Sequence, residues 1–384
     1  MKKLIRITTI PLSLEKLLEG QLRFMNGYFK VTAISSEKQR LEKYGEHEGV
    51  STFHLPLTRK ITPIKDIVSV FKLYKFLKKE KPEIIHTHTP KAGIVGMVAA
   101  ILANVPIRLH TVAGLPLLET KGLKRTILIQ VEKITYRLAT NVYPNSNGLN
   151  DIILSKNFTS SNKLKVLGNG STNGIDTTYF SKSNFSEDDL INERNKLNIP
   201  LEDFVFVFVG RIVSDKGINE LIESFLKLHK KHKKCSLLLV GPFEDDLDPI
   251  SNKTKSAILE NEKIINTGYK EDVRIFYALS NALIFPSYRE GFPNVVMQAG
   301  AMGLPCIVTD INGCNEIIED HRNGLVIPSK NNKVLFDKME LLVNNVVLLT
   351  KLSSKSRQMI LDSYEQREVW EAILAEYKIL LKNL

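Results

Sequence analysis

The chain has 384 residues, 43% of them hydrophobic and 25% charged. This composition excludes a disordered or fibrous protein, and the length exceeds what one hydrophobic core usually supports, so two domains are expected. Three cysteines, Cys235, Cys306 and Cys314, exclude a disulfide framework and favour a reducing compartment. The net charge is +11, and residues 1–170 hold 27 Lys and Arg against 12 Asp and Glu. A basic half fits nucleic acid, an anionic membrane surface or a phosphorylated substrate, and charge alone does not choose among them.

The first ten residues begin with two lysines, as a signal peptide would. Arg6 interrupts the apolar run and no small-residue cleavage site follows, so a β-strand is the better interpretation. The most apolar stretch, Ala92–Val105, is shorter than the roughly 20 residues that cross a bilayer and predicts a buried helix. We therefore expect a cytoplasmic chain that does not span a membrane.

Short apolar runs rich in β-branched residues alternate with helical patterns along the chain, which predicts parallel sheets built from βαβ units. The first half gives strands at Leu4–Ile10, Val31–Ser35, Ser51–Leu55, Ile84–Thr87, Ile107–Thr111, Asn141–Tyr143 and Lys165–Leu167. The second half gives strands at Phe204–Gly210, Ser236–Gly241, Ile264–Thr267, Ala282–Phe285, Cys306–Thr309 and Leu325–Ile327.

A polar break at Asn173–Phe185 separates the two series. The pattern predicts an α/β protein with two Rossmann-like parallel-sheet domains, residues 1–173 and 174–364, that face a central cleft. The end of the chain is helical by pattern, and we expect a helix at about 365–384 to pack back on the first domain.

Residues 66–81 predict an amphipathic helix with one apolar face, made of Ile67, Val70, Phe71, Tyr74 and Leu77. Its lysines lie largely elsewhere. The simple interpretation is a helix packed on its sheet with a solvated face. The alternative is contact with anionic lipid headgroups.

Gly210-Arg-Ile-Val-Ser-Asp-Lys-Gly217 directly follows an apolar strand and precedes a predicted helix at Ile218–Leu228. A glycine there lets a ligand approach the backbone, the helix offers free N–H groups, and Arg211 and Lys216 add two cations. This pattern predicts a diphosphate site that needs no metal, whereas the alternative is a basic surface turn. Because neither a P-loop nor G-x-G-x-x-G spacing occurs, P-loop NTPases and dinucleotide dehydrogenases are not favoured.

The segment Ser287–Pro305 joins a strand end, a tight Gly291-Phe292-Pro293 loop and a helix that Asn294 is predicted to cap. Glu290 and Gln298 are expected to face the strand ends. A carboxylate and an amide suit neighbouring hydroxyls, as on a sugar and a ribose. A capped surface helix is the alternative.

Taken in order, these motifs resemble those of family 4 retaining glycosyltransferases, which have the two-domain GT-B fold. Further matching pieces are Leu239-Val-Gly241-Pro, Thr267-Gly-Tyr269 and Asn173-Gly-Ile-Asp176. The resemblance covers nearly the whole chain. It implies that Arg211 and Lys216 hold the donor diphosphate and that Glu290 holds hydroxyls of the donor sugar. It also implies that further residues line the donor site: Gly210, Gly241, Tyr269, Gly291, Phe292, Pro293, Asn294 and Gln298. The chain departs from the family pattern at Gln298, where glutamate is usual, so altered nucleotide binding is expected.

Two groups in the first domain are candidates on the same grounds. His110 resembles the family's strand-end histidine, which would hydrogen-bond the transferred sugar or steer charge in the transition state; a satisfied polar residue at a strand end is the alternative. His88 and Lys91 follow another strand and would contact the acceptor, or form an ordinary strand-to-helix turn. His86 and His88 lack acidic or cysteine partners at ligand spacing, so a metal site is not favoured.

The resemblance implies an enzyme that moves a sugar from a nucleotide-diphosphate sugar, expected to be a UDP-sugar, to a glycan hydroxyl with retained configuration and without metal or other cofactor. The expected acceptor is a polyprenyl-diphosphate-linked glycan in surface-polysaccharide assembly. The enzyme is expected to contact the inner face of the cytoplasmic membrane peripherally and to bind no nucleic acid. The alternatives are a sugar-nucleotide epimerase of the same fold, a non-enzymatic binder of anionic polymers, and a weak homologue with a structural role.

Overall fold

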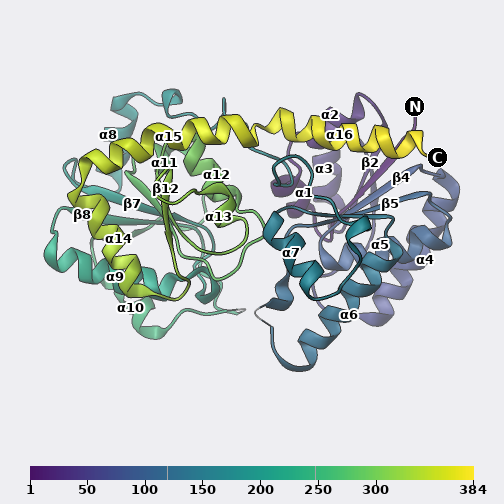
Figure 1. Ribbon diagram of the computed structural model, residues 1–384, viewed down its shortest axis with the longest axis horizontal. Helices are drawn as coiled ribbons and strands as arrows, with labels where there is room; N and C mark the ends of the chain where they lie inside the picture. Colours follow the sequence, from purple (N-terminus) through teal and green to yellow (C-terminus); the bar gives the residue numbers. More distant parts are fainter. Residues whose placement is uncertain (119, 247) are drawn as a thin grey trace. The chain divides into compact units, whose positions relative to one another are not determined.

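The computed structural model describes residues 1–118, 120–246 and 248–384. The chain divides into two compact units, Met1–Gly174 with Arg367–Leu384, and Ile175–Gln366. Each unit contains one six-stranded parallel sheet with helices on its faces (Figure 1). The predicted α/β class with two Rossmann-like sheets is confirmed.

The first unit has its sheet in the order β3-β2-β1-β4-β5-β6. Its strands are β1 (Lys3–Ile7), β2 (Lys30–Ser35), β3 (Ser51–His54), β4 (Ile84–His88), β5 (Ile107–Val112) and β6 (Asn141–Pro144). Its helices are α1 (Pro11–Leu17), α2 (Gln21–Asn26), α3 (Lys38–Glu48), α4 (Pro63–Glu80), α5 (Pro90–Leu102), η1 (Pro116–Leu118), α6 (Gly122–Leu138), α7 (Asn147–Ser155), η2 (Ser161–Lys163) and, from the end of the chain, α16 (Gln366–Lys382).

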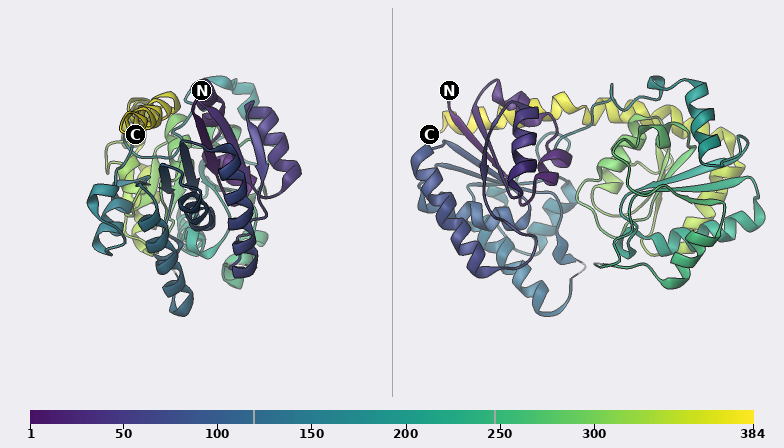
Figure 2. Two further views of the ribbon diagram at one scale, coloured as in Figure 1. Left: turned by 90° about the vertical axis from the view of Figure 1, so that its right-hand side faces the viewer. Right: turned by 180° about the vertical axis from the view of Figure 1, so that it is seen from behind.

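The two faces of this sheet have separate cores. On one face Ile5, Ile7 and Ile85 pack under α4, α5 and α6, which lie side by side with α5 in the middle (Figure 2). On the other face Leu4 and Ile84 pack with α1, α2 and α16. Because side chains alternate along a strand, residues one apart in β1, β4 and β5 meet different helices.

The second unit has the same topology, β9-β8-β7-β10-β11-β12. Its strands are β7 (Phe204–Val209), β8 (Cys235–Val240), β9 (Ile264–Asn266), β10 (Ala282–Phe285), β11 (Cys306–Thr309) and β12 (Gly324–Ile327). Its helices are η3 (Lys182–Asn184), α8 (Glu187–Lys196), η4 (Ser214–Lys216), α9 (Ile218–Lys231), α10 (Asn252–Glu260), α11 (Arg274–Ala278), α12 (Asn294–Ala301), α13 (Cys314–Ile317), α14 (Asn332–Asn344) and α15 (Val346–Tyr364).

The central position of β7 follows from its sequence. Val205 to Phe208 are fully buried on both faces of the strand, as the continuous apolar run predicts. In each sheet the strand order reverses beside the first strand, between β1 and β4 and between β7 and β10. Ligands of such sheets bind outside the carboxyl ends of the strands at this switch point.

The predicted strand at Lys165–Leu167 is wrong. The preceding Leu164 makes an isolated parallel bridge to Val142, and Lys165 N donates one hydrogen bond to Val142 O. Pairing stops there because Gly168 and Gly170 take positive φ angles of 55° and 94° and turn the chain away.

The predicted packed face of α4 is wrong in part. Leu73 and Leu77 are buried, whereas Ile67 and Phe71 are 59% and 61% exposed. The helix is therefore rotated relative to the prediction, and an apolar side faces outward. The predicted buried helix at 92–105 is confirmed by α5, whose centre is buried. Across residues 1–118, 120–246 and 248–384, no helix is long and apolar enough to cross a membrane.

Candidate functional site

Three glycines bring the ends of β7, β8 and β10 together in the second unit. Gly210 and Gly241 end β7 and β8, and a Cβ on Gly241 would lie 1.8 Å from the Gly210 carbonyl oxygen. Gly217 has φ 71°, and a Cβ there would lie 2.1 Å from the Pro286 carbonyl oxygen. No other residue fits these approaches without displacing backbone. The glycines thus set the start of α9 directly against the end of β10.

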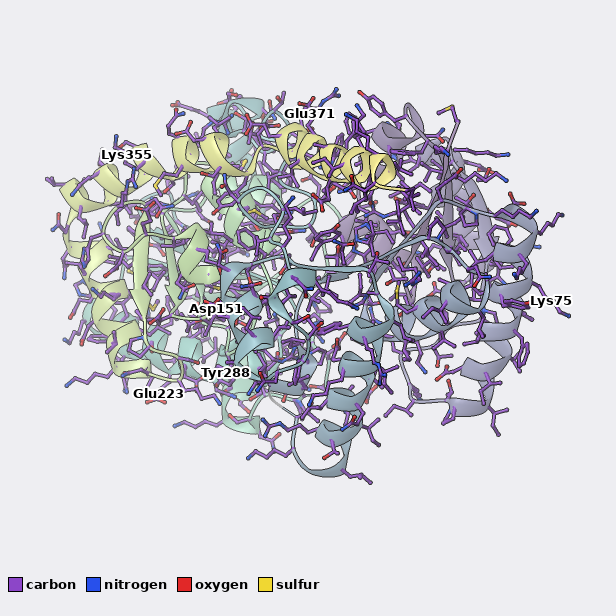
Figure 3. All side chains as sticks on the ribbon, turned by 45° about the vertical axis from the view of Figure 1, so that its right-hand side comes forward. Lys75, Asp151, Glu223, Tyr288, Lys355 and Glu371 are labelled. Carbon is purple, nitrogen blue, oxygen red and sulfur yellow. The ribbon has the colours of Figure 1, made fainter. Side chains whose placement is uncertain are left out.

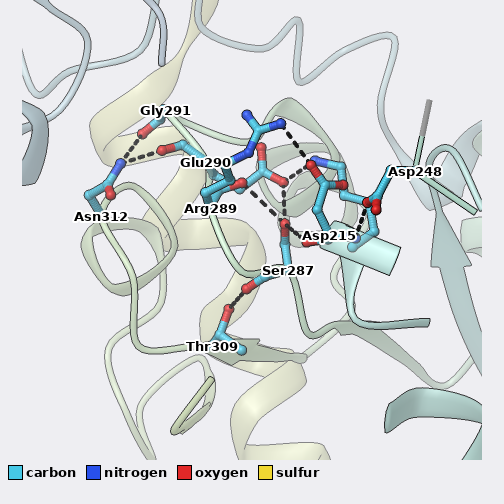
Figure 4. Close-up of polar contacts among 9 residues, drawn as sticks. Asp215, Asp248, Ser287, Arg289, Glu290, Gly291, Thr309 and Asn312 are labelled. Carbon is cyan, nitrogen blue, oxygen red and sulfur yellow. Dashed lines mark hydrogen bonds and ion pairs between the residues drawn. The ribbon is translucent and has the colours of Figure 1, made fainter. Parts of the chain in front are cut away.

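At this junction Lys216 and Glu290 form an ion pair between Nζ and Oε1. The two residues are 74 positions apart in the sequence, and their side chains are only 16% and 15% exposed. Ser287, fully buried at the end of β10, donates a second hydrogen bond to Glu290 Oε1 at 2.8 Å (Figure 4). The carboxylate therefore has a fixed position beside the N-terminus of α9.

A second ion pair lies next to the first. Arg289 Nη2 and Asp215 Oδ2 are 2.7 Å apart, and the Asp215 backbone N–H donates to Asp248 Oδ2 at 2.6 Å (Figure 4). Asp215 Oδ1 and Arg289 Nε are buried and have no hydrogen-bond partner among the residues that the structure describes. The sequence prediction missed this pair, although both residues stand inside the two motifs.

Arg211, the other predicted diphosphate cation, forms an ion pair with Glu244 in the loop after β8. Its side chain is 43% exposed, so it is open to a ligand. Each cation assigned to the diphosphate thus has a carboxylate partner in this structure. An anionic ligand would have to compete with Glu244 and Glu290 for them.

The Gly291–Pro293 loop is held from two sides. Asn312 Nδ2 donates to the Glu290 carbonyl oxygen, and the Phe292 ring packs edge-on against Tyr364 at 5.2 Å. Pro293 occupies the N-cap of α12. The prediction that Asn294 caps this helix is wrong, because the helix already begins at Asn294.

Gln298 lies half-buried one turn into α12, where its Oε1 accepts a hydrogen bond of 3.2 Å from the Tyr277 hydroxyl. Tyr277 is fully buried, and burial holds its pKa well above the ordinary value, so this hydroxyl remains a donor. Tyr269, in contrast, is 63% exposed after β9. Gln298 and Tyr269 keep their predicted roles as expectations.

His110 lies in β5, where the structure buries its side chain. His110 is 2% exposed on the face of the sheet that α5 covers, and a Cβ on Gly93 would lie 2.6 Å from its ring. Its Nδ1 hydrogen-bonds Thr87 Oγ1 at 2.8 Å. Burial lowers the pKa of His110 to about 3, so the ring is neutral. The contact of His110 with a transferred sugar stays a prediction, and so does its alternative.

His88 lies on the opposite face, also buried, where Arg6 Nη2 donates to its Nε2 at 2.8 Å. Arg6 is fully buried and further bonds Gln21 Oε1 at 2.7 Å and the Tyr377 hydroxyl at 2.8 Å. Burial, with the charge of Arg6, holds the pKa of His88 well below its ordinary value. Arg6 therefore ties α2 and α16 to the sheet and holds His88 in place, and the sequence prediction missed this pairing.

Lys91 lies in the first turn of α5 and is the more accessible of the two acceptor candidates. Its Nζ is 2.5 Å from Asp66 Oδ2 and 3.4 Å from Thr62 Oγ1, with 13% of the side chain exposed. Within the described residues, no group of three or more His, Cys, Asp or Glu is arranged to hold a metal ion.

Comparison with known proteins places this architecture. The family of glycosyl transferases group 1 matches residues 190–359, and the glycosyl transferase 4-like domain matches residues 26–170. The chain is 32% identical to the capsular polysaccharide biosynthesis glycosyltransferase CapM of Staphylococcus aureus, over 100% of this chain and 98% of that protein. It is 30% identical to the Escherichia coli UDP-Gal:alpha-D-GlcNAc-diphosphoundecaprenol alpha-1,3-galactosyltransferase, over 79% and 77% of the two chains.

Among solved structures, Anabaena HepE in complex with UDP-glucose shares the fold with a TM-score of 0.80 at 16% identity, covering 98% of this chain and all of that one. The fold, the order of the motifs and the full-length match to CapM agree. The chain belongs to the group 1 glycosyltransferases of GT-B fold and is itself a glycosyltransferase.

Proposed function

We propose that this enzyme transfers a sugar, with retained anomeric configuration and without a metal ion, from a UDP-sugar to a hydroxyl of a polyprenyl-diphosphate-linked glycan. The observation that carries the proposal is the junction of β7, β10 and α9, where Lys216, Arg211 and a helix N-terminus supply positive charge beside the carboxylate of Glu290. These groups match the two ends of a nucleotide sugar, an anionic diphosphate and a hydroxyl-rich ring.

The leaving group of the reaction is a nucleoside diphosphate, and its developing charge is the main electrostatic demand of the transition state. Lys216 and Arg211 take that charge in place of a divalent cation, exchanging their carboxylate partners for phosphate oxygens. Glu290 then loses its cation and is left to accept hydrogen bonds from sugar hydroxyls. Its fixed position, through Ser287, keeps the sugar oriented.

Two lines of support favour a UDP-sugar and a lipid-linked acceptor. The Anabaena relative of the fold binds UDP-glucose, and the E. coli relative acts on a diphosphoundecaprenol-linked sugar from UDP-Gal. The basic first half of the chain suits an acceptor that carries a diphosphate. The enzyme would work in the cytoplasm, at the inner face of the membrane that holds such lipids.

The test combines binding and turnover. UDP, GDP, ADP and their common sugar conjugates are titrated by calorimetry with EDTA present, and the preferred donor is then incubated with short-chain polyprenyl-diphosphate-linked sugars. Selective, EDTA-resistant binding of uridine nucleotides and a product with the donor's anomeric configuration by NMR would support the proposal. Binding restored only by a divalent cation would contradict the metal-free mechanism, and conversion of donor without any acceptor would identify an epimerase.

A further inference from the structure

The first unit contains a pocket of about 660 Å³ outside the carboxyl ends of β1, β2 and β3. Its apolar lining comes from Ile10 after β1, from Pro56 and Leu57 after β3, and from Ile64 and Val68 on α4. This volume lies in the range of pockets that hold small ligands, and such pockets are mostly apolar with a few polar groups. His88 is not among the residues that line this pocket.

The pocket opens onto an apolar side of α4 that the described residues of its unit leave exposed. Ile64, Ile67, Val68 and Phe71 are 82%, 59%, 47% and 61% exposed. Their spacing of three and four residues places them on one stripe, opposite the buried Leu73 and Leu77. A helix normally hides such a stripe in the core, so its exposure indicates contact with an apolar partner.

Several lysines lie on α4 and near the pocket that it borders. Lys65 lines it, Lys72 and Lys75 flank the exposed stripe, and Lys75 extends outward from α4 (Figure 3). Lys91 reaches the same end of the helix through its ion pair with Asp66. Glu37 is an acidic residue in the lining. A partner that suits this surface combines a hydrocarbon with an anionic group.

We propose that the pocket binds the hydrocarbon chain of the acceptor lipid next to its diphosphate, with Ile64 and Val68 contacting the chain and Lys65 and Lys91 facing the phosphates. The inference rests on the lipid-linked acceptor of the proposed function and adds the place where its lipid binds. A bilayer surface is broad and covers protruding side chains, whereas a concave pocket of this size holds a single chain. Ile67 and Phe71, on the same helix outside the pocket, are left to contact the bilayer itself.

The experiment measures binding of soluble prenyl diphosphates by calorimetry, without sugar transfer. The probes are farnesyl diphosphate, geranyl diphosphate and inorganic pyrophosphate. The pocket variant is Ile64→Asn with Val68→Asn. The matched control is Ile67→Asn with Phe71→Asn, which removes two apolar side chains from the same helix outside the pocket. All four positions are exposed, so neither variant disturbs the core, and UDP binding by each variant checks the second unit.

We expect farnesyl diphosphate to bind about tenfold or more tightly than geranyl diphosphate, since each buried methylene strengthens binding by roughly fourfold. The pocket variant should lose at least about tenfold in affinity for farnesyl diphosphate and the control variant less than about twofold. Equal binding of pyrophosphate and farnesyl diphosphate, equal losses in the two variants, or no prenyl binding would each overturn the inference. Prenyl binding without UDP binding would contradict a UDP-sugar donor and would still support this pocket as the site of the lipid chain.

Discussion

Replacing Lys216 with methionine removes the cation beside Glu290 while keeping most of the side-chain volume. Glu290 would be left as a carboxylate that is 15% exposed, with Ser287 as a hydrogen-bond donor. Breaking a buried ion pair by removing one partner costs about 3–5 kcal/mol, and the remaining exposure of this pair reduces that to about 2–3 kcal/mol. For a unit of this size we expect Tm to fall by about 5–10 °C.

Activity should fall by more than stability predicts. If Lys216 contacts the donor diphosphate, its loss removes a group that stabilises the leaving charge, which typically costs about 10²–10³ in kcat. The double variant Lys216→Met with Glu290→Gln separates the two effects, because a neutral amide needs no cation. Its Tm should return close to the wild-type value, whereas kcat should stay low.

Lys227→Met is the matched control, since it removes a lysine from the same helix, α9. Lys227 pairs with Glu223 at 2.7 Å, but both side chains are about half exposed, so the loss should stay below about 0.5 kcal/mol. Thermal unfolding, UDP calorimetry and turnover are measured on all four proteins. A Lys216→Met enzyme that binds UDP within twofold of the wild type would refute a role for Lys216 at the diphosphate.

Three further outcomes are expected. Gln298→Glu places a carboxylate beside the Tyr277 hydroxyl and should tighten UDP binding about fivefold by calorimetry, because a charged acceptor makes stronger hydrogen bonds. Unchanged or weaker binding would contradict a ribose contact. Burial raises the pKa of Glu132 from 4.5 to about 7. Between these two pKa values the folded state keeps a proton that the unfolded state has lost, so the free energy of unfolding should fall by about 3 kcal/mol as pH rises from 4.5 to 7. Glu132→Gln should flatten this pH dependence in urea unfolding, and an unchanged slope would count against the assignment. Ile67→Asn with Phe71→Asn should reduce sedimentation with vesicles of anionic lipid, and equal sedimentation of both proteins would leave this stripe without a membrane role.

The fold was predictable where the local pattern has one physical meaning. The run Phe204–Val209 is apolar at every position and alternates aromatic with β-branched residues, which favours a short strand buried on both faces. A three-residue run such as Lys165–Leu167 suits a strand and a turn equally, and the glycines that follow decide it. In α4, apolar residues occur all round the helix. Periodicity therefore did not reveal that Leu73 turns inward and Phe71 outward, since this depends on how the helix meets its sheet.

The motifs of the candidate site were predictable from the sequence, whereas the ion pairs between its side chains were not. Strand, glycine and helix order placed Arg211 and Lys216 at one sheet edge, because carboxyl ends of parallel strands share an edge. The carboxylates that hold these cations come from elsewhere: Glu244 is 33 residues from Arg211. Similarly, Arg6 lies 82 residues before its partner His88. Such pairs depend on sheet order and register, which a single sequence does not specify.

The two sheets have the same strand order, yet their switch points differ in a way that bears on their roles. Between β7 and β10 the strand ends carry two ion pairs, Lys216 with Glu290 and Arg289 with Asp215. A charged ligand can replace one partner of such a pair and so leave few charged groups without a partner. Between β1 and β4 the strand ends are closed, because the Thr9 and Thr89 hydroxyls bond each other at 2.7 Å and Thr89 Oγ1 also accepts from the Thr9 backbone N–H.

A ligand at that closed point would have to break neutral hydrogen bonds that hold the loops together. The opening in the first unit lies instead to one side, at the ends of β1 to β3, where the lining is apolar and Lys65 stands at its edge. With identical topology, one unit thus has charge-paired strand ends and the other has an apolar pocket. That asymmetry suits the proposed function, in which the donor is rich in phosphate and hydroxyl groups and the acceptor carries a hydrocarbon chain.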